Sequence, residues 1–240
     1  MTPSPAARAA RVPAVDVLRA LALIAMIAYH FAFDLRYYGV IGTDFEHDPV
    51  CLAVRTAILA SFLLLAGVGL ALAARAGAPP ARFWRRVAEI GACALLVSAG
   101  SYAMFPQSYI WFGVLHAIAV TLVLARPLAD KPRVAGALGL AVIAAGLLFT
   151  HPAFDNRALG WIGFMTVKPF TEDYVPLFPW AGVLLLGIPL GHALAAADFR
   201  ALAVLAAFPR AFALAGRHTL VVYMIHQPIL LGLLALVLRR

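Results

Sequence analysis

The sequence predicts an all-α fold, a polytopic membrane helix bundle of about seven transmembrane helices with its N-terminus in the cytoplasm. Three observations predict it. First, 64% of the 240 residues are hydrophobic and only 12% are charged, whereas a soluble domain is roughly half apolar and a quarter charged. Second, the apolar residues form runs of about 20, the length that one membrane-crossing helix needs. Third, the basic residues gather at alternate ends of these runs.

Seven apolar runs have the required length. They cover residues 15–38, 50–74, 85–104, 109–128, 133–150, 176–196 and 218–238. Ala and Leu dominate them and no period-2 alternation appears, which excludes strands. A helix also satisfies its own backbone polar groups in lipid. Residues 201–208 are apolar but too short to span, so we expect a turn of helix at the interface.

The distribution of Lys and Arg predicts the orientation. One set of connections holds Arg8, Arg11, Arg75, Arg82, Arg85, Arg86, Arg126, Lys131, Arg133, Arg200, Arg210 and Arg217. The other set holds only Arg36, Arg157, Lys168, Arg239 and Arg240, with most of the acidic residues. The positive-inside rule places the first set in the cytoplasm; the terminal Arg pair conflicts with this, but the internal clusters outweigh it. The net charge of +8 therefore faces anionic lipid headgroups rather than nucleic acid.

The chain is expected to contain one folded part. Residues 1–13 are predicted to be a disordered cytoplasmic tail, and residues 14–240 a single transmembrane domain. Cys51 and Cys93 fall in different spans, so we expect no disulfide, and no metal-ligand spacing appears. The longest external loop, 151–175, carries aromatic residues and is expected to lie in or dip into the membrane interface.

Ionisable residues within spans are costly, so each is a candidate for function. Asp16 and Arg19 share a helix face; they either form an ion pair at the interface or help to hold a ligand. His30 and Asp34 share a face near the outer end of the same span. There the carboxylate would favour an imidazolium or orient the neutral ring, unless the two residues only pack helices together. His47 lies among acidic residues just before the second span.

Further polar residues lie in later spans. His116 is about two turns into the fourth span, where it either bonds a neighbouring helix or acts in function. His226, Gln227 and Pro228 make a polar spot deep in the last span, because the proline leaves a backbone carbonyl unpaired one turn earlier. A basic cluster at the cytoplasmic start of the third span is either a positive-inside anchor or a phosphate clamp. It consists of Arg82, Arg85 and Arg86.

Four segments in order resemble one family. They are VDVLRALALIAMIAYHFAFDL, FLLLAGVGLALAAR, GVLHAIAV and GRHTLVVYMIHQP. They are similar to helices of the catalytic domain of heparan-alpha-glucosaminide N-acetyltransferase and its bacterial relatives, within the transmembrane acyltransferase superfamily. The last segment is shared with that broader superfamily. The resemblance covers most of the chain and implies that 14–240 is a transmembrane acyltransferase-like domain.

The resemblance also implies site residues. A histidine in the first external loop, about twenty residues before the glycine of the second helix, is catalytic in the family; here His47 precedes Gly67 by that spacing. Lysosomal members carry an asparagine where this chain has His30, a departure that bears on how the acceptor or acetyl group is held. They also have more spans, which argues against a heparan-type substrate. We therefore predict His47, His30 and Asp34 as catalytic. The predicted contacts of acetyl-CoA are Arg19, Arg82, Arg85, Arg86, His116 and Arg217.

The family reaction implies transfer of acetyl from cytoplasmic acetyl-CoA to a sugar amine or hydroxyl across the membrane. Acetyl-CoA is then a co-substrate, and no metal is expected. His47 would act either as general base or as a nucleophile that forms an acetyl-imidazole. Asp34 or Asp48 would orient its ring, and a charged His30 would stabilise the oxyanion. The acceptor is expected to be an extracytoplasmic glycan or amino sugar, the location a bacterial inner membrane, and a homodimer stays open.

Other classes of function stay open as well. A proton-coupled transporter or flippase subunit would use His30, Asp34, His116 and His226 as a relay, although no inverted repeat is evident. Haem ligation by His116 and His226 is a third alternative. A purely structural membrane subunit would not explain so many histidines within the spans.

Overall fold

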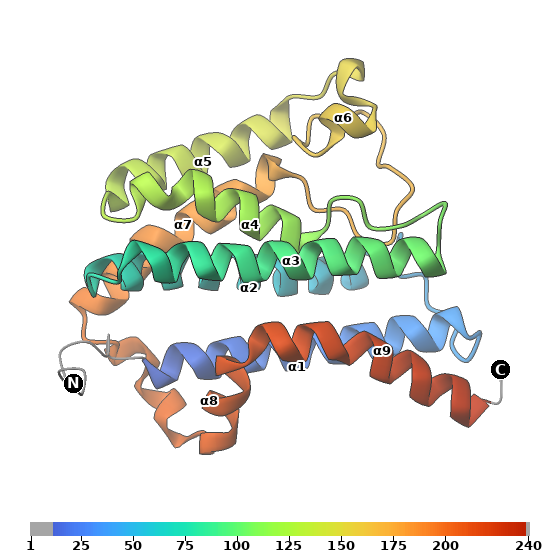
Figure 1. The fold of residues 1–240 in the computed structure, drawn as a ribbon, viewed down its shortest axis with the longest axis horizontal. Coiled ribbons are helices and arrows are strands. Elements are labelled where there is room, and N and C mark those ends of the chain that lie inside the picture. The colour runs from blue at the N-terminus through green and yellow to red at the C-terminus, as the bar shows by residue number, and fades with distance from the viewer. Residues whose placement is uncertain (1–11, 239–240) are drawn as a thin grey trace. The chain divides into compact units, whose positions relative to one another are not determined.

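The computed structural model describes residues 12–238, and this part of the chain is helical, with no strand. Figure 1 shows the order of the elements. The α-helices are α1 (Pro13–Tyr37), α2 (Pro49–Arg75), α3 (Pro80–Met104), α4 (Val114–Ala125), α5 (Pro132–Leu148), α6 (Arg157–Gly160), α7 (Leu177–Ala196), α8 (Arg210–Arg217) and α9 (Thr219–Leu238). Short 3-10 helices are η2 (Arg126–Leu128), η3 (Pro152–Phe154) and η4 (Arg200–Ala207). The predicted all-α class is confirmed.

The predicted membrane spans correspond to seven apolar helices. Five of them, α1, α2, α3, α7 and α9, are long and apolar enough to cross a membrane, and α4 and α5 are shorter. Pro13, Pro49, Pro80 and Pro132 each open one of these helices, a position where the missing N–H costs nothing. The chain is therefore an integral membrane protein. The predicted tail 1–13 falls mostly on residues 1–11, which lie outside the described residues.

One prediction about the spans is wrong in its boundary. The fourth run was expected to be helical from residue 109, but α4 begins at Val114. Side chains hold the chain before it: Ser98 Oγ donates to the carbonyl of Ile110 at 2.6 Å, and Ser101 Oγ accepts the Ile110 N–H at 2.9 Å. Asp173 accepts the N–H of Val114 at 2.9 Å. Polar side chains thus replace the helical hydrogen bonds of this stretch. Residues 201–208, expected to be a short turn of helix, form η4.

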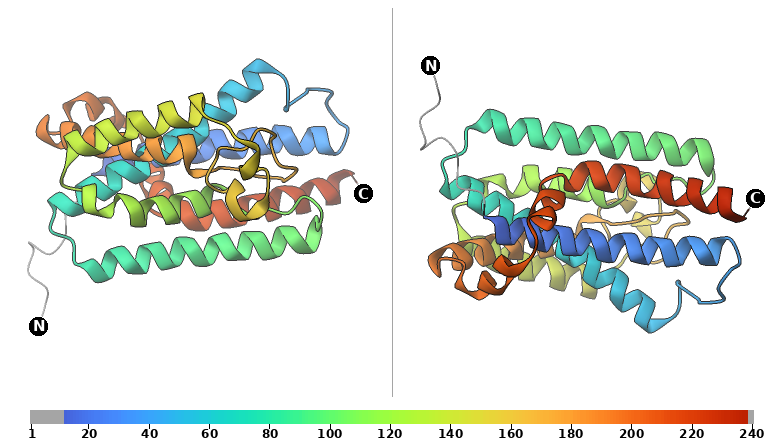
Figure 2. Two further views of the ribbon diagram at one scale, coloured as in Figure 1. Left: turned by 90° about the horizontal axis from the view of Figure 1, so that it is seen from above. Right: turned by 90° about the horizontal axis from the view of Figure 1, so that it is seen from below.

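The described chain divides into two compact units, and α2 contributes to both. The first runs from Leu63 to Ala201 and is held together by close helix contacts. In it, α5 and α7 lie side by side and antiparallel (Figures 1 and 2). Gly139 and Gly182 bring their backbones together, as small residues do where membrane helices approach closely.

The second unit combines residues 12–62 with residues 202–238. Here α1 and α9 run side by side in the same direction (Figure 2), and α8 packs against the start of α1. Gly216 permits this, because a Cβ there would lie 1.7 Å from the carbonyl oxygen of Asp16. The sequence pattern alone does not predict this pairing of the first and last spans.

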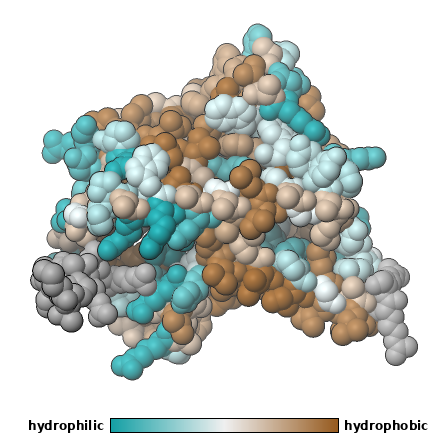
Figure 3. All heavy atoms as spheres, in the orientation of Figure 1, coloured by the Kyte–Doolittle hydropathy of each residue, from teal (hydrophilic) through white to brown (hydrophobic). Residues whose placement is uncertain are grey.

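Large apolar side chains cover much of the surface. Figure 3 shows hydrophobic residues, in brown, over α9, where Leu236 is 76% exposed and Val237, Ile229 and Leu233 are also exposed. Exposed apolar area of this extent is unusual in soluble proteins. It agrees with helices whose outer faces contact lipid.

The connection between α5 and α7 folds back on itself. Asp155 accepts hydrogen bonds from the backbone N–H and the hydroxyl of Thr166, and the Tyr174 hydroxyl donates to the carbonyl of Gly160 at 2.6 Å. Burial raises the pKa of Tyr174 to about 12. Phe164 packs its ring on that of Phe178, whereas Phe170 is 78% exposed. Of the aromatic residues in this loop, Phe170 is thus the one that most resembles an interfacial contact.

Candidate active site

Four polar side chains meet between α1 and α9. Nδ1 of His30 lies 2.8 Å from Nε2 of His226, and the amide nitrogen of Gln227 donates to Oδ1 of Asp34 at 2.6 Å. Asp34 is 2% exposed and His226 is also buried. We call these four residues the α1/α9 cluster. Burying each of these polar groups in the membrane costs free energy. The hydrogen bonds between the two helices offset part of that cost.

The partners of His30 and Asp34 differ from the predicted ones. The two residues share a face of α1, as expected from their spacing, but their hydrogen bonds run to α9 rather than to each other. The side chain of Gln227, which was not among the predicted site residues, donates a hydrogen bond to the Asp34 carboxylate. The chain separation of 193 residues between Asp34 and Gln227 explains why no local pattern predicts the contact.

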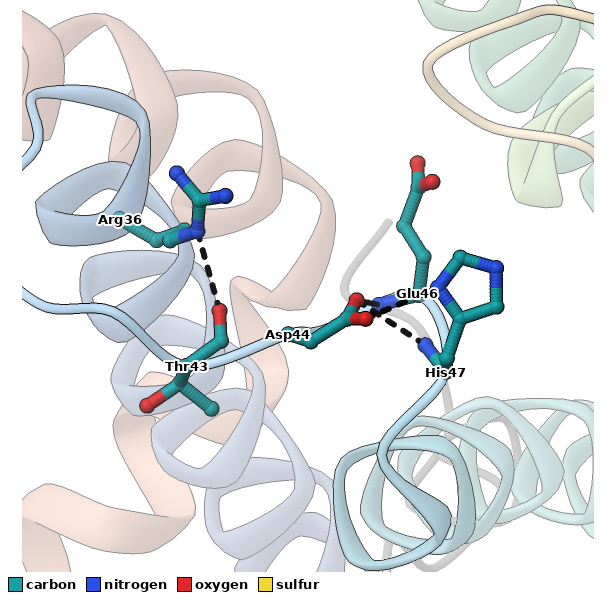
Figure 4. A network of polar contacts seen from close by, with 5 residues as sticks. All are labelled: Arg36, Thr43, Asp44, Glu46 and His47. Carbon is teal, nitrogen blue, oxygen red and sulfur yellow. Dashed lines mark hydrogen bonds and ion pairs between the residues drawn. The ribbon is translucent and has the colours of Figure 1, made fainter.

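His47 lies on an exposed turn between α1 and α2. Asp44 Oδ1 accepts the N–H groups of Glu46 and His47, and Asp44 Oδ2 is 2.9 Å from Nδ1 of the His47 ring (Figure 4). The carboxylate can only accept, so Nδ1 carries hydrogen and Nε2 is left as the reactive nitrogen when the ring is neutral. The His47 side chain is 80% exposed, which leaves it accessible to a substrate.

The predicted partners of His47 are wrong. Neither Asp34 nor Asp48 orients its ring; Asp48 instead accepts the N–H groups of Val50 and Cys51 at the start of α2. Asp44 orients it, and the sequence offered a signal in the three-residue spacing within a Gly- and Asp-rich turn. The pKa of the Asp44 carboxyl is lowered from its usual value, first by the N–H of Glu46 and then by the side chain of His47.

Phe45 fixes this turn against α1. Its ring is buried and makes edge contacts with Tyr29 at 5.4 Å and with Phe33 at 5.7 Å between ring centroids. These two residues flank His30 in α1 and lie one turn apart. The turn that carries His47 is therefore anchored at the level of the α1/α9 cluster.

Asp44→Asn is expected to lower the rate of any reaction that depends on His47 by only about 2- to 5-fold, because exposed charge pairs contribute little. Asparagine retains the oxygen that accepts the turn's N–H groups but lacks the charge that holds the ring. Since the lowered pKa keeps Asp44 ionised far below neutral pH, the difference between the variants should persist across the pH range of a steady-state assay. A loss above 100-fold would contradict the view that Asp44 only orients His47.

Arg19 and Arg217, both predicted to contact acetyl-CoA, lie around Asp16 in the second unit. Arg19 Nη1 is 2.8 Å from Asp16 Oδ1, and Arg217 Nε is 3.5 Å from Asp16 Oδ2. Asp16 is buried, and its Oδ2 makes no hydrogen bond. Two guanidinium groups share one carboxylate here, so the group retains a positive charge. The Asp16–Arg19 ion pair, one of the two alternatives predicted for these residues, is present, and a role in holding a ligand stays a prediction.

The three arginines at the start of α3 belong to the first unit. Arg85 and Arg86 each lie 3.5 Å from an oxygen of Glu89, and Arg82 is exposed one turn earlier. The carboxylate of Glu89 offsets part of this charge. The amino end of a helix also favours anions. The cluster suits a phosphate chemically, and its role in binding acetyl-CoA stays a prediction.

His116, also predicted to contact acetyl-CoA, caps its own helix. Its Nδ1 accepts the N–H of Gly113 at 3.2 Å, and its Nε2 lies 3.2 Å from Ser98 Oγ. Ser98 already donates to a carbonyl, so its oxygen accepts from the His116 ring. Both ring nitrogens of His116 are thus engaged, as are both of His226. This argues against the haem alternative, which requires a ring nitrogen with a free lone pair.

No group of three or more His, Cys, Asp or Glu residues within residues 12–238 lies close enough together to hold a metal ion. The predicted catalytic residues form two sets in the second unit: His47 on the exposed turn, and His30 with the buried Asp34 in the α1/α9 cluster.

Comparison with known proteins identifies the family. The family model described as heparan-alpha-glucosaminide N-acetyltransferase, catalytic, matches residues 11–228. The comparisons with curated proteins and with solved structures returned no match. The family match includes α1, the turn with His47 and the α9 residues of the cluster, and it implies a transmembrane acetyltransferase. The chain belongs to the catalytic family of heparan-alpha-glucosaminide N-acetyltransferase.

Proposed function

We propose that this protein transfers an acetyl group from cytoplasmic acetyl-CoA to an amine or hydroxyl of an extracytoplasmic sugar. The observation that carries the proposal is a spacing within α1. Arg19 and His30 are eleven residues apart, which is about 16 Å along a helix. The pantetheine arm of CoA is also on the order of 15–20 Å long. A phosphate held near Arg19 would thus place the thioester near His30.

Residues of α8 and α9 lie beside both of these positions. Arg217 lies beside Asp16 and Arg19, while His226, nine residues further on, lies beside His30. Phe45 anchors the His47 turn at this second level. In the proposal, Arg19 and Arg217 hold phosphate. That Arg82, Arg85 and Arg86, which belong to the first unit, also contact acetyl-CoA is a separate proposal. His116 is proposed only to maintain the structure on which the site is built.

His47 carries the proposed chemistry in one of two ways. As general base, its Nε2 removes a proton from the acceptor while the acceptor attacks the thioester carbonyl. As nucleophile, Nε2 attacks first, the carbon–sulfur bond breaks, and the acetyl-imidazole then passes its acetyl group to the acceptor. In both cases the acceptor loses one proton and the sulfur leaves as thiolate, which takes up a proton to give CoA.

The proposed setting follows the predicted orientation. The N-terminus and the arginine clusters face the cytoplasm, where acetyl-CoA is made, and the His47 turn faces the opposite side of a bacterial inner membrane. A homodimer and the surrounding lipid are the proposed partners besides acetyl-CoA and the glycan.

The direct test measures acetyl-CoA binding and turnover by detergent-purified protein. Saturable binding of acetyl-CoA, with CoA release that depends on an added amino sugar such as glucosamine, is the expected result. The buried ionisable groups of the α1/α9 cluster make a proton-coupled transporter the second candidate. Folded protein that binds no acetyl-CoA, but takes up solute into vesicles along a proton gradient, would favour that candidate and overturn the proposal.

A further inference from the structure

We infer that His226 and Gln227 are positioning residues for acetyl transfer, which hold His30 and Asp34 so that both offer a hydrogen-bond acceptor to the substrate. The inference rests on the proposed function and extends it to two residues of α9. It follows from where each hydrogen of the α1/α9 cluster must lie.

The first step is the hydrogen on His226. Its Nδ1 lies 2.6 Å from the carbonyl oxygen of Tyr223 in the preceding turn. A carbonyl only accepts, so Nδ1 of His226 must carry hydrogen. In the neutral ring, Nε2 is then an acceptor. The ring of His226 is therefore set in one tautomer by its own helix.

The second step determines the tautomer of His30 from that of His226. Its Nδ1 is 2.8 Å from Nε2 of His226. With Nε2 of a neutral His226 as acceptor, Nδ1 of His30 must donate, and Nε2 of a neutral His30 keeps its lone pair. In a neutral histidine, the hydrogen bond made by one ring nitrogen thus determines whether the other nitrogen carries a hydrogen. The backbone of α9 thus makes Nε2 of His30 a base.

The third step concerns Gln227. Because the Asp34 carboxylate only accepts, the atom of Gln227 that lies 2.6 Å from it is the amide nitrogen. Oδ2 of Asp34 and Oε1 of Gln227 are buried and make no hydrogen bond within residues 12–238. Oδ2 of Asp34 therefore gives the cluster an unpaired acceptor, in addition to Nε2 of His30. A hydrogen-bearing group is needed to complete it, and the acceptor amine or hydroxyl of the proposed reaction is such a group.

The proton balance of acetyl transfer is consistent with this arrangement. The carbon–sulfur bond of acetyl-CoA breaks, a bond forms from the acetyl carbon to the nitrogen or oxygen of the acceptor, and the acceptor gives up one proton. Where His47 acts as nucleophile rather than as base, Nε2 of His30 can receive that proton, which finally reaches the CoA thiolate. In this inference, His226 and Gln227 act by fixing His30 and Asp34, the groups that meet the substrate.

The test compares His226→Leu with His226→Gln, whose side-chain oxygen can still accept from His30. We expect His226→Leu to lower kcat at least 10-fold, since small displacements of reacting groups can cost up to about 100-fold, with the KM for acetyl-CoA changed less than twofold. His226→Gln should recover most of that loss. Ile225→Leu, an adjacent residue of α9 that is 48% exposed, serves as the control for disturbance of the helix.

A second measurement reports the tautomer without any need for turnover. In protein labelled with ¹⁵N-histidine, the ring-nitrogen signals that are lost in His30→Asn should show hydrogen on Nδ1 and none on Nε2. His226→Leu should abolish this pattern and His226→Gln should retain it. Hydrogen on Nε2 of His30 in the wild type would overturn the inference.

The outcomes separate this inference from the proposed function. Active wild-type protein in which His226→Leu and His226→Gln lose kcat equally, or not at all, overturns only the positioning role. Folded wild-type protein that transfers no acetyl group overturns the proposed function and this inference with it. Gln227→Leu gives an independent check, because it should lower kcat while leaving the His30 tautomer unchanged.

Discussion

His47→Ala is expected to lower the rate of acetyl transfer by about 10²- to 10⁴-fold, the usual contribution of a general base or a comparable catalytic histidine. Binding of acetyl-CoA should stay close to that of the wild type, because the proposed phosphate contacts lie elsewhere in the chain. Thermal stability should also be retained, since the His47 side chain is 80% exposed and surface substitutions have small effects on the free energy of unfolding. Single-turnover release of CoA, measured beside equilibrium binding, checks both parts.

The matched control is His151→Ala. His151 is also an exposed loop histidine, and it also lies close to an aspartate-containing turn, but its ring accepts only the N–H of Ala153. This variant should transfer acetyl at the wild-type rate. Near-normal transfer by His47→Ala would remove His47 from the chemistry and leave His30 as the candidate base.

Gly67→Ala is expected to have the largest effect on stability. A Cβ at this position of α2 would lie 2.0 Å from the carbonyl oxygen of Leu184 and 2.9 Å from Cα of Gly187 in α7. Both are backbone atoms, so no side chain can turn away and the helices must separate. Overpacking of this kind costs about 1–3 kcal/mol, more than the gain in helix propensity of up to about 1 kcal/mol.

The effect can be measured as the melting temperature of the purified protein, with Gly100→Ala as the control. Gly100 lies in α3 and has no atom within 4 Å of the position that a Cβ would take. The same substitution should therefore raise the melting temperature slightly at Gly100 and lower it by several degrees at Gly67. Equal shifts at the two positions would show that the close approach of α2 and α7 does not limit stability.

Much of the fold could be predicted because lipid imposes a simple rule. A run of about 20 apolar residues has few alternatives to a helix in the membrane, and α1, α2, α3, α7 and α9 follow it. The rule fails at residues 109–113, where the run is apolar but not helical. There the backbone is satisfied by Ser98, Ser101 and Asp173, whose contribution depends on the tertiary structure and has no local signature.

The candidate site was partly predictable for a similar reason. His30 and Asp34 could be singled out because an ionisable group within a span needs an explanation. Their partners could not, since His226 and Gln227 follow more than 190 residues later. Asp44 could not be singled out although it lies three residues before His47, because this loop contains several acidic residues and only the geometry of the turn selects one.

The stretch before α4 also constrains the order in which the protein can be completed. Three residues of the later loop bind this stretch. Glu172 accepts a hydrogen bond from Ser108, and Thr171 donates to the carbonyl of Tyr109. Asp173 accepts the N–H of Val114, the first residue of α4. These partners are separated from it by 59 to 64 residues. On the ribosome, α3 and α4 emerge well before them. The connection between α3 and α4 therefore acquires its final conformation only after α5 and the loop that follows it have been made. In this part of the protein, folding of an earlier segment depends on synthesis of a later one.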